Sequence, residues 1–245
     1  MSFRTVSGRR STLVALCAAA LVATGCSTLP ADAAPTEGGS FPGASAVRST
    51  LDTLPVKGRA PKTGYSRDEF GPSWTDDVRV DGGHNGCDTR NDILERDLTN
   101  ETYKPGTRDC VVATGTLADP YTGKTIDFVR GQDTSSAVQI DHVVALSDSW
   151  QKGAQQLDPQ TRKDFANDPR NLLASDGPAN QQKSDSDAAS WLPPNKAYRC
   201  TYVAKQVEVK AAYRLWVTQA EKDAISRVLD TCADAPSGAG SGSAN

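Results

Sequence analysis

Asp141 and His142 stand side by side in an apolar run, residues 138–146 (VQIDHVVAL). They occupy positions where a buried strand would carry valine or isoleucine, and polar groups in such places have a partner or a chemical task. A histidine with its ordinary pKa of about 6.5 can take a proton from water at neutral pH. A carboxylate can hold a hard divalent cation. The pair alone would equally suit a structural hydrogen bond.

Three later residues complete a set that could hydrolyse a phosphodiester. Asn171 lies in DPRNLLAS, and Asn180 and Lys183 lie in GPANQQKSD. Neighbouring residues of a regular strand point to opposite faces, so Asp141 and His142 reach one point only if their strand ends or bends there. Asn180, expected in the first turn of a helix, can give an ion a second oxygen ligand. Lys183 follows one turn later, within reach of a phosphate or simply in solvent.

The order of these residues resembles the HNH, or ββα-metal, nuclease motif: Asp-His at the end of a strand, Asn-Leu opening a second strand, then asparagine with lysine three positions later. IDHVVAL, NDPRNLLA and ANQQKSD are most similar to the HNH domain at the C-terminus of GmrSD-type restriction endonucleases, which also occurs in exported actinobacterial proteins. The similarity spans about residues 65–232 and includes GCDTRNDIL and WLPPNKAYRC.

The resemblance implies an α+β fold with a ββα-metal core, an N-terminal β-hairpin and C-terminal helices. It implies that His142 is the general base, that Asp141 and Asn180 bind one divalent ion, and that Asn171 braces the loop holding the histidine. The ion would be Mg²⁺, or alternatively Mn²⁺. Many members have histidine at the position of Asn180, and an amide oxygen favours a hard ion over zinc or nickel.

Two other charged residues have open roles. Arg90 in CDTRND could bind a phosphate or pair with Asp92 or Asp97. His84, the only other histidine, lies in the loop DGGHNGC and is expected to be a turn residue, not a second base. Lys183 and Arg90 are therefore the candidates for substrate binding.

Four cysteines, Cys87, Cys110, Cys200 and Cys232, lie in the part of the chain that can build a core. An even number in an exported chain indicates two disulfides. Three pairings are open, and we favour Cys87–Cys110 with Cys200–Cys232 because each pair brackets a compact segment. A zinc site is disfavoured because no two cysteines have the close spacing of zinc ligands.

The N-terminus has the pattern of an export signal. Residues 1–25 carry three arginines, then an apolar run over 13–23, then small residues. Cys26 after Ala-Thr-Gly resembles a bacterial lipobox, which would anchor the protein by a lipid on the outer face of the membrane; ordinary secretory cleavage is the alternative. Residues 26–59 are expected to form a flexible linker, 60–234 the domain and 235–245 a disordered tail.

Periodicity and turn signals predict the elements of the domain. Asp185 and Asp187 are expected on a solvated acidic face. The predicted helices are 89–98, 147–154, 159–165, 178–191, 201–216 and one opened by a capping box at Thr218-x-x-Glu221; the predicted strands are the hairpin 110–117 and 125–130, then 138–146 and 171–174.

After loss of the signal the chain has 24 basic and 30 acidic residues, a formal charge of −6. That charge argues against a protein that coats nucleic acid, but a metal and local cations can still serve a phosphodiesterase. We therefore predict a monomeric, metal-dependent endonuclease with DNA as the favoured substrate and RNA as the alternative. The rival interpretations are an inactive HNH fold that serves as a surface binding module, and a hydrolase of another phosphodiester.

Overall fold

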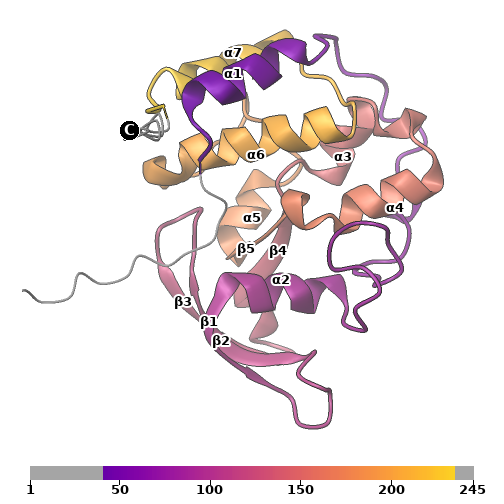
Figure 1. Cartoon of the computed structure of the whole chain (residues 1–245), viewed down its shortest axis with the longest axis vertical. Helices are drawn as coiled ribbons and strands as arrows, with labels where there is room; N and C mark the ends of the chain where they lie inside the picture. Colours follow the sequence, from indigo (N-terminus) through magenta and orange to yellow (C-terminus); the bar gives the residue numbers. More distant parts are fainter. Residues whose placement is uncertain (1–40, 235–245) are drawn as a thin grey trace, which may run out of the picture. The chain divides into compact units, whose positions relative to one another are not determined.

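The computed structural model describes residues 41–234, which form a mixed α+β structure (Figure 1). The predicted signal, the lipidation site Cys26 and the C-terminal tail lie outside these residues. The strands are β1 (Leu98–Tyr103), β2 (Val112–Ala118), β3 (Thr125–Val129), β4 (Val138–His142) and β5 (Leu172–Asp176). The α-helices are α1 (Ala44–Thr53), α2 (Thr89–Asp97), α3 (Leu146–Gln151), α4 (Pro159–Asn167), α5 (Gly177–Lys183), α6 (Arg199–Ala212) and α7 (Gln219–Leu229). None of these helices is long and apolar enough to cross a membrane.

Strands β4 and β5 form a two-stranded antiparallel sheet, and α5 follows β5 directly. In the sheet Ile140 lies opposite Ala174, and both pack into the core together with α2. Asp176 caps α5 by accepting a hydrogen bond from the amide of Ala179 (2.8 Å). The strand, predicted to run to residue 146, ends at His142, and the helix predicted over 178–191 ends at Lys183.

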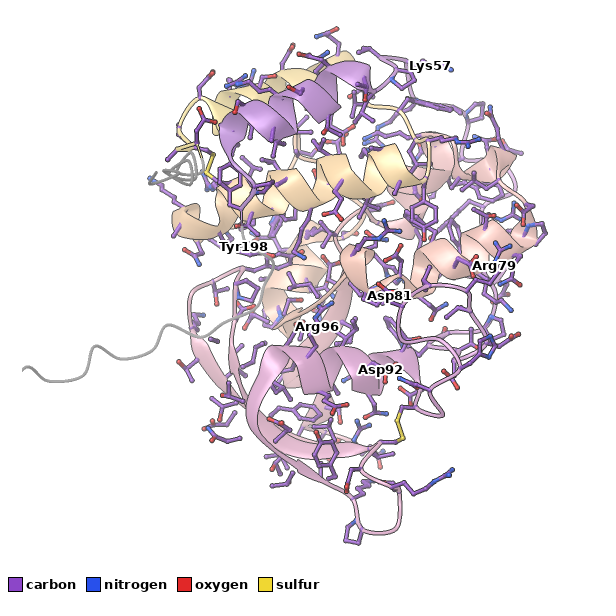
Figure 2. All side chains as sticks on the ribbon, in the orientation of Figure 1. Lys57, Arg79, Asp81, Asp92, Arg96 and Tyr198 are labelled. Atoms are coloured by element: carbon purple, nitrogen blue, oxygen red, sulfur yellow. A yellow bond between two sulfur atoms is a disulfide. The ribbon has the colours of Figure 1, made fainter. Side chains whose placement is uncertain are left out.

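A second sheet has the order β1–β2–β3, with all pairs antiparallel. The predicted hairpin is β2 and β3; β1 was not predicted because its sequence, LTNETY, buries only Leu98. Helix α2 packs on this sheet through Ile93 and Leu94. Its Arg96, labelled in Figure 2, donates hydrogen bonds to the carbonyls of Pro169 and Leu172, both at 2.8 Å. Helix α2 thereby ties the two sheets together.

Helix α1 corrects the predicted flexible linker over 26–59. The segment buries Val47 and Leu51, which pack with residues of α6 and α7 (Figure 1). Low overall apolar content led to the linker prediction, yet the few large apolar residues recur at helical spacing on one face. Residues 44–53 therefore belong to the folded domain.

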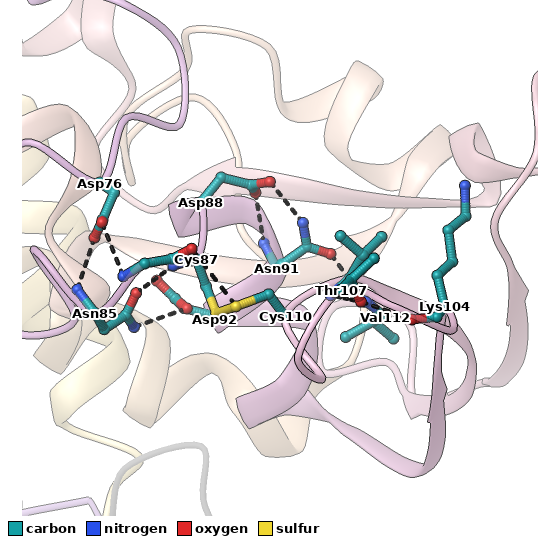
Figure 3. The surroundings of a disulfide bond; sticks show 12 residues. Asp76, Asn85, Cys87, Asp88, Asn91, Asp92, Lys104, Thr107, Cys110 and Val112 are labelled. Carbon is teal, nitrogen blue, oxygen red and sulfur yellow. Dashed lines mark hydrogen bonds between the residues drawn. A yellow bond between two sulfur atoms is a disulfide. The ribbon is translucent and has the colours of Figure 1, made fainter.

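Both predicted disulfides are present. Cys200–Cys232 joins the start of α6 to the segment after α7, and Cys87–Cys110 joins the residue before the cap of α2 to the β1–β2 connection. Figure 3 shows that Asp76 lies beside Cys87, where its carboxylate accepts hydrogen bonds from the amides of Asn85 (3.0 Å) and Gly86 (2.9 Å). The disulfide and Asp76 thus fix the irregular segment that leads into α2.

A buried charge network replaces the acidic face predicted for Asp185 and Asp187. Asp185 is exposed, but Asp187 is buried and pairs with Lys152 at 2.7 Å. Three cations and three carboxylates from five segments meet here: Arg59, Lys152, Lys210, Asp148, Asp187 and Glu221. Equal numbers of each sign allow these charges to be buried together.

Replacing Leu51 by alanine tests whether α1 is part of the domain. Leu51 is 1% exposed, so its truncation should lower the free energy of unfolding by about 2–5 kcal/mol. Val56→Ala, at a side chain that is 42% exposed, is the matched control and should change it by less than about 1 kcal/mol. Urea unfolding measures both variants. Equal stability of L51A and wild type would mean that α1 does not pack on the domain.

Candidate active site

His142 ends β4 and lines a cavity of about 480 Å³. Its Nε2 lies 2.9 Å from the carbonyl oxygen of Ala166. A carbonyl can only accept a hydrogen bond, so Nε2 carries the proton and Nδ1 keeps a free lone pair. The imidazole is therefore held in the tautomer that can accept a proton at Nδ1.

Trp74 lies against one face of this imidazole. The ring centroids are 5.7 Å apart and the planes differ by 14°. Trp74 has a φ of 55°, a left-handed conformation that is costly for a bulky residue. Its carbonyl accepts a hydrogen bond from the amide of Thr89 (3.2 Å), at the start of α2. Sequence reasoning missed Trp74, because nothing in its irregular segment links it to a histidine far along the chain.

The surroundings of His142 keep the imidazole neutral. Burial, helped by the positive charges of Arg67 and Lys183, lowers the pKa of His142 to about 4, although the hydrogen bond to Ala166 opposes this shift. The side chain is thus an unprotonated base at neutral pH.

Asn171 connects the segments on both sides of the histidine. Its Oδ1 accepts a hydrogen bond from the amide of Val144 (2.8 Å), and its Nδ2 donates to the carbonyls of Val144 (3.3 Å) and Phe165 (3.4 Å). Val144 follows the histidine by two residues, and Phe165 precedes the Ala166 acceptor. Fully buried Asn171 therefore holds His142 and its hydrogen-bond acceptor in fixed positions.

Asp141 points toward the core and meets Lys183 there. Lys183 Nζ donates to Asp141 (3.0 Å) and to the carbonyl of His142 (2.8 Å), while the hydroxyl of Tyr121 donates to the other carboxylate oxygen. Burial raises the pKa of Asp141, although Lys183 and Tyr121 both favour the ionised form. Lys183 has no exposed surface and does not line the cavity, so its predicted contact with a phosphate does not fit this arrangement.

Asn180 lies at the cavity wall with Asp141 and Gln139. Its Nδ2 donates to Gln139 Oε1 (2.9 Å), and its Oδ1 accepts no hydrogen bond from the described residues. The predicted ligands Asp141 and Asn180 therefore share a cavity with His142. No group of three or more His, Cys, Asp or Glu residues within 41–234 could by itself hold a metal ion.

Two other predicted residues lie away from this cavity. Arg90 neither pairs with Asp92 or Asp97 nor lines the cavity; its guanidinium donates to the carbonyl of Val138 (3.1 Å), at the start of β4. Arg90 therefore holds the start of β4 and does not make the predicted phosphate contact at this cavity. His84 is exposed with a φ of 59°, as expected of a turn residue.

The cavity also has a wall that the sequence did not predict. Lys62, Tyr65 and Arg67 line it from the irregular segment before α2, and Ser147 and Asp185 line it from α3 and the segment after α5. Helical or strand periodicity is absent from the first segment, so no spacing rule could bring it to His142.

The site thus consists of a neutral, buried histidine beside a polar cavity. Residues 88–228, more than half of the chain, match the family of GmrSD restriction endonucleases, C-terminal domain, and the chain belongs to this family. An "uncharacterized secreted protein" of Arthroderma benhamiae is 39% identical over 195 residues, covering 79% of this chain and 88% of the relative. That relative is fungal, so the similarity is not confined to actinobacteria. No solved structure matches the chain.

The Asp141–Lys183 pair makes a stability prediction. Lys183→Met leaves a buried carboxylate without its counter-ion and should lower the free energy of unfolding by about 3–5 kcal/mol. The double variant Asp141→Asn, Lys183→Met contains neither charge and should recover much of that loss. Urea unfolding in EDTA measures the cycle. A loss below about 1 kcal/mol in K183M would indicate a solvated lysine.

The pKa of His142 predicts how stability depends on pH. Because the folded value of about 4 lies below the unfolded value of 6.5, the unfolded chain binds more protons between these limits. The free energy of unfolding should therefore fall as the pH is lowered from 6.5 to 4, with roughly 3 kcal/mol coming from His142.

Comparison with His142→Gln in EDTA isolates this contribution from that of the carboxylates. The variant should have a shallower dependence of stability on pH in this range. Identical slopes for wild type and H142Q would show that His142 titrates normally.

Proposed function

We propose that this protein is an endonuclease that hydrolyses phosphodiester bonds of DNA, with His142 as general base. The observation that carries the proposal is the 2.9 Å contact of His142 Nε2 with Ala166, which leaves Nδ1 to accept a proton beside a polar cavity. Membership of a restriction-endonuclease domain family supports the same chemistry.

In the proposed reaction a water molecule in the cavity donates its proton to Nδ1 of His142 as its oxygen attacks phosphorus. The P–O bond to the leaving oxygen breaks, and that oxygen takes up a proton from solvent. Trp74 and Ala166 hold the ring plane and the tautomer during this step. The negative charge of a bound phosphodiester favours the imidazolium, which offsets the low pKa of the free site. Once protonated, the ring keeps its hydrogen bond to Ala166, which further stabilises its positive charge.

We further propose that β4, β5 and α5 form a ββα-metal core. Asp141 and Asn180 lie on the same cavity, and a carboxylate with an amide oxygen suits Mg²⁺ or Mn²⁺. When bound, such an ion would stabilise charge on the phosphate and the leaving oxygen. Asp141 and Asn180 would give the ion only two protein ligands, so waters and the substrate phosphate would supply most of its other ligands.

Export is the proposed destination of the chain. Two disulfides are expected outside the reducing cytoplasm, and the name of the fungal relative describes a secreted protein. The signal-like residues 1–25 agree with this destination. Lipid attachment at Cys26 is a further proposal, supported by the sequence around that cysteine alone, and it would tether the domain to a membrane surface.

The rival function, an inactive surface binding module, is favoured by the Asp141–Lys183 pair. An internal ammonium already compensates the carboxylate that would bind the ion. The rival predicts no hydrolysis with any divalent ion, whereas a hydrolase of another phosphodiester predicts cleavage of a small bis-aryl phosphate but not of nucleic acid.

Plasmid nicking with Mg²⁺, Mn²⁺ or EDTA tests the proposal. We expect cleavage with the ions and not with EDTA. His142→Ala should cleave about 10²–10⁴-fold more slowly, which is the range of general-base contributions. His84→Ala, at the other histidine, should retain wild-type activity.

RNA and a bis-aryl phosphate are tested beside the plasmid, and each alternative function predicts a different result. Native-rate cleavage by folded H142A would reject His142 as the base. Cleavage of RNA or of the bis-aryl phosphate alone would reject DNA as the substrate. Absence of cleavage of all three by the wild type would leave the binding module as the function.

A further inference from the structure

The two cations that the sequence offered for substrate binding do not face the cavity. Lys183 is buried against Asp141, and Arg90 is bonded to the start of β4. A side-chain cation close to the phosphate stabilises the negative charge that grows during cleavage, in addition to any metal ion. The cations that line the cavity with His142 are Lys62 and Arg67.

Of these two, Arg67 has its charge available. Lys62 pairs with Asp185 at 3.2 Å, and Asp185 also accepts a hydrogen bond from Ser147. Arg67 forms no ion pair and no side-chain hydrogen bond with any residue of the described range, 41–234. Its guanidinium, with five donors in a planar fork, suits the oxygens of a phosphate.

Packing anchors the backbone at Arg67, whose side chain is exposed. Arg67 opens the short 3₁₀ helix Arg67–Phe70, whose Phe70 is buried against Phe165 and Trp150. The neighbouring Glu69 accepts a hydrogen bond at its carbonyl from Arg162 (2.7 Å) and pairs with it through its carboxylate (3.1 Å). These contacts anchor the backbone that carries Arg67.

Arg67 and His142 also meet in a second, smaller hollow. Trp74 and Ala166, which hold the imidazole, line this hollow with them. Arg67 thus stands at the junction of the two hollows, beside the ring.

We propose that Arg67 binds the non-bridging oxygens of the phosphate attacked by the water that His142 deprotonates. The assignment rests on the proposed nuclease function and gives to Arg67 the substrate binding that the sequence had assigned to Lys183 and Arg90. Arg67 would hold the phosphate beside the water that Nδ1 deprotonates. It would also stabilise the negative charge that grows on the phosphate during attack.

Arg67→Ala, Arg67→Lys and Arg108→Ala form the test set. Arg108, exposed in the β1–β2 connection, is the control for the loss of one positive charge. With plasmid or duplex DNA and Mg²⁺, R67A should lower kcat/KM by about 10²–10³-fold, the size expected for one transition-state donor. R67K should lie between R67A and wild type because an ammonium keeps the charge but not the fork. R108A should match wild type.

A binding measurement separates phosphate contact from a structural role. In EDTA, H142A and H142A/R67A are compared by fluorescence anisotropy with labelled duplex at several salt concentrations. Loss of one phosphate contact should reduce the slope of log affinity against log salt by about 1. H142A/R108A should retain the H142A slope.

The outcomes distinguish failure of the proposed role of Arg67 from failure of the proposed nuclease function. If the wild type cleaves DNA and R67A has the same kcat/KM and the same salt slope, Arg67 does not bind the phosphate. The nuclease function is then retained. Wild type that cleaves no phosphodiester rejects the nuclease function, and the role of Arg67 with it. If R67A does not fold, R67K decides: wild-type kcat/KM in R67K rejects bidentate phosphate binding.

Discussion

The hydrogen bond from His142 Nε2 to the carbonyl of Ala166 is the constraint around which the site is built. It fixes the tautomer, and the tautomer decides which nitrogen can accept a proton. Asn171 holds His142 and Ala166 in their relative positions by hydrogen bonds to Val144 and to Phe165. Trp74 holds the ring plane. The surrounding elements, β4, β5, α4 and the segment before α2, give these contacts their rigidity.

The interior of the protein contains several buried ion pairs. Asp141 with Lys183, and the six-residue network around Lys152, place ammonium and carboxylate groups in the interior, where each sign compensates the other. Such pairs add little net stability but make the loss of one partner costly. They therefore constrain how the helices pack and hold Asp141 against Lys183.

Patterns within short stretches of the sequence predicted those parts of the site that depend only on neighbouring residues. The run VQIDHVVAL predicted the strand that carries His142, and a helix was predicted where α5 begins, although both elements end earlier than predicted. Burial of Lys183 was beyond such reasoning, because it depends on Tyr121 and Asp141 from distant segments. Likewise, α1 was hidden by linker-like composition, and the Tyr65–Trp74 segment has no periodicity that reports its tertiary position. Spacing therefore singled out His142, but packing decides which cations lie beside it.

The tautomer of His142 tests the central claim most directly, and the chain has only two histidines. Proton-detected ¹⁵N correlation spectra of the imidazoles at neutral pH can assign the protonation of each ring nitrogen, with exposed His84 as the internal reference. The account predicts a neutral His142 with the proton on Nε2 and a bare Nδ1, both with and without Mg²⁺. A proton on Nδ1, or a charged ring at neutral pH, would contradict it.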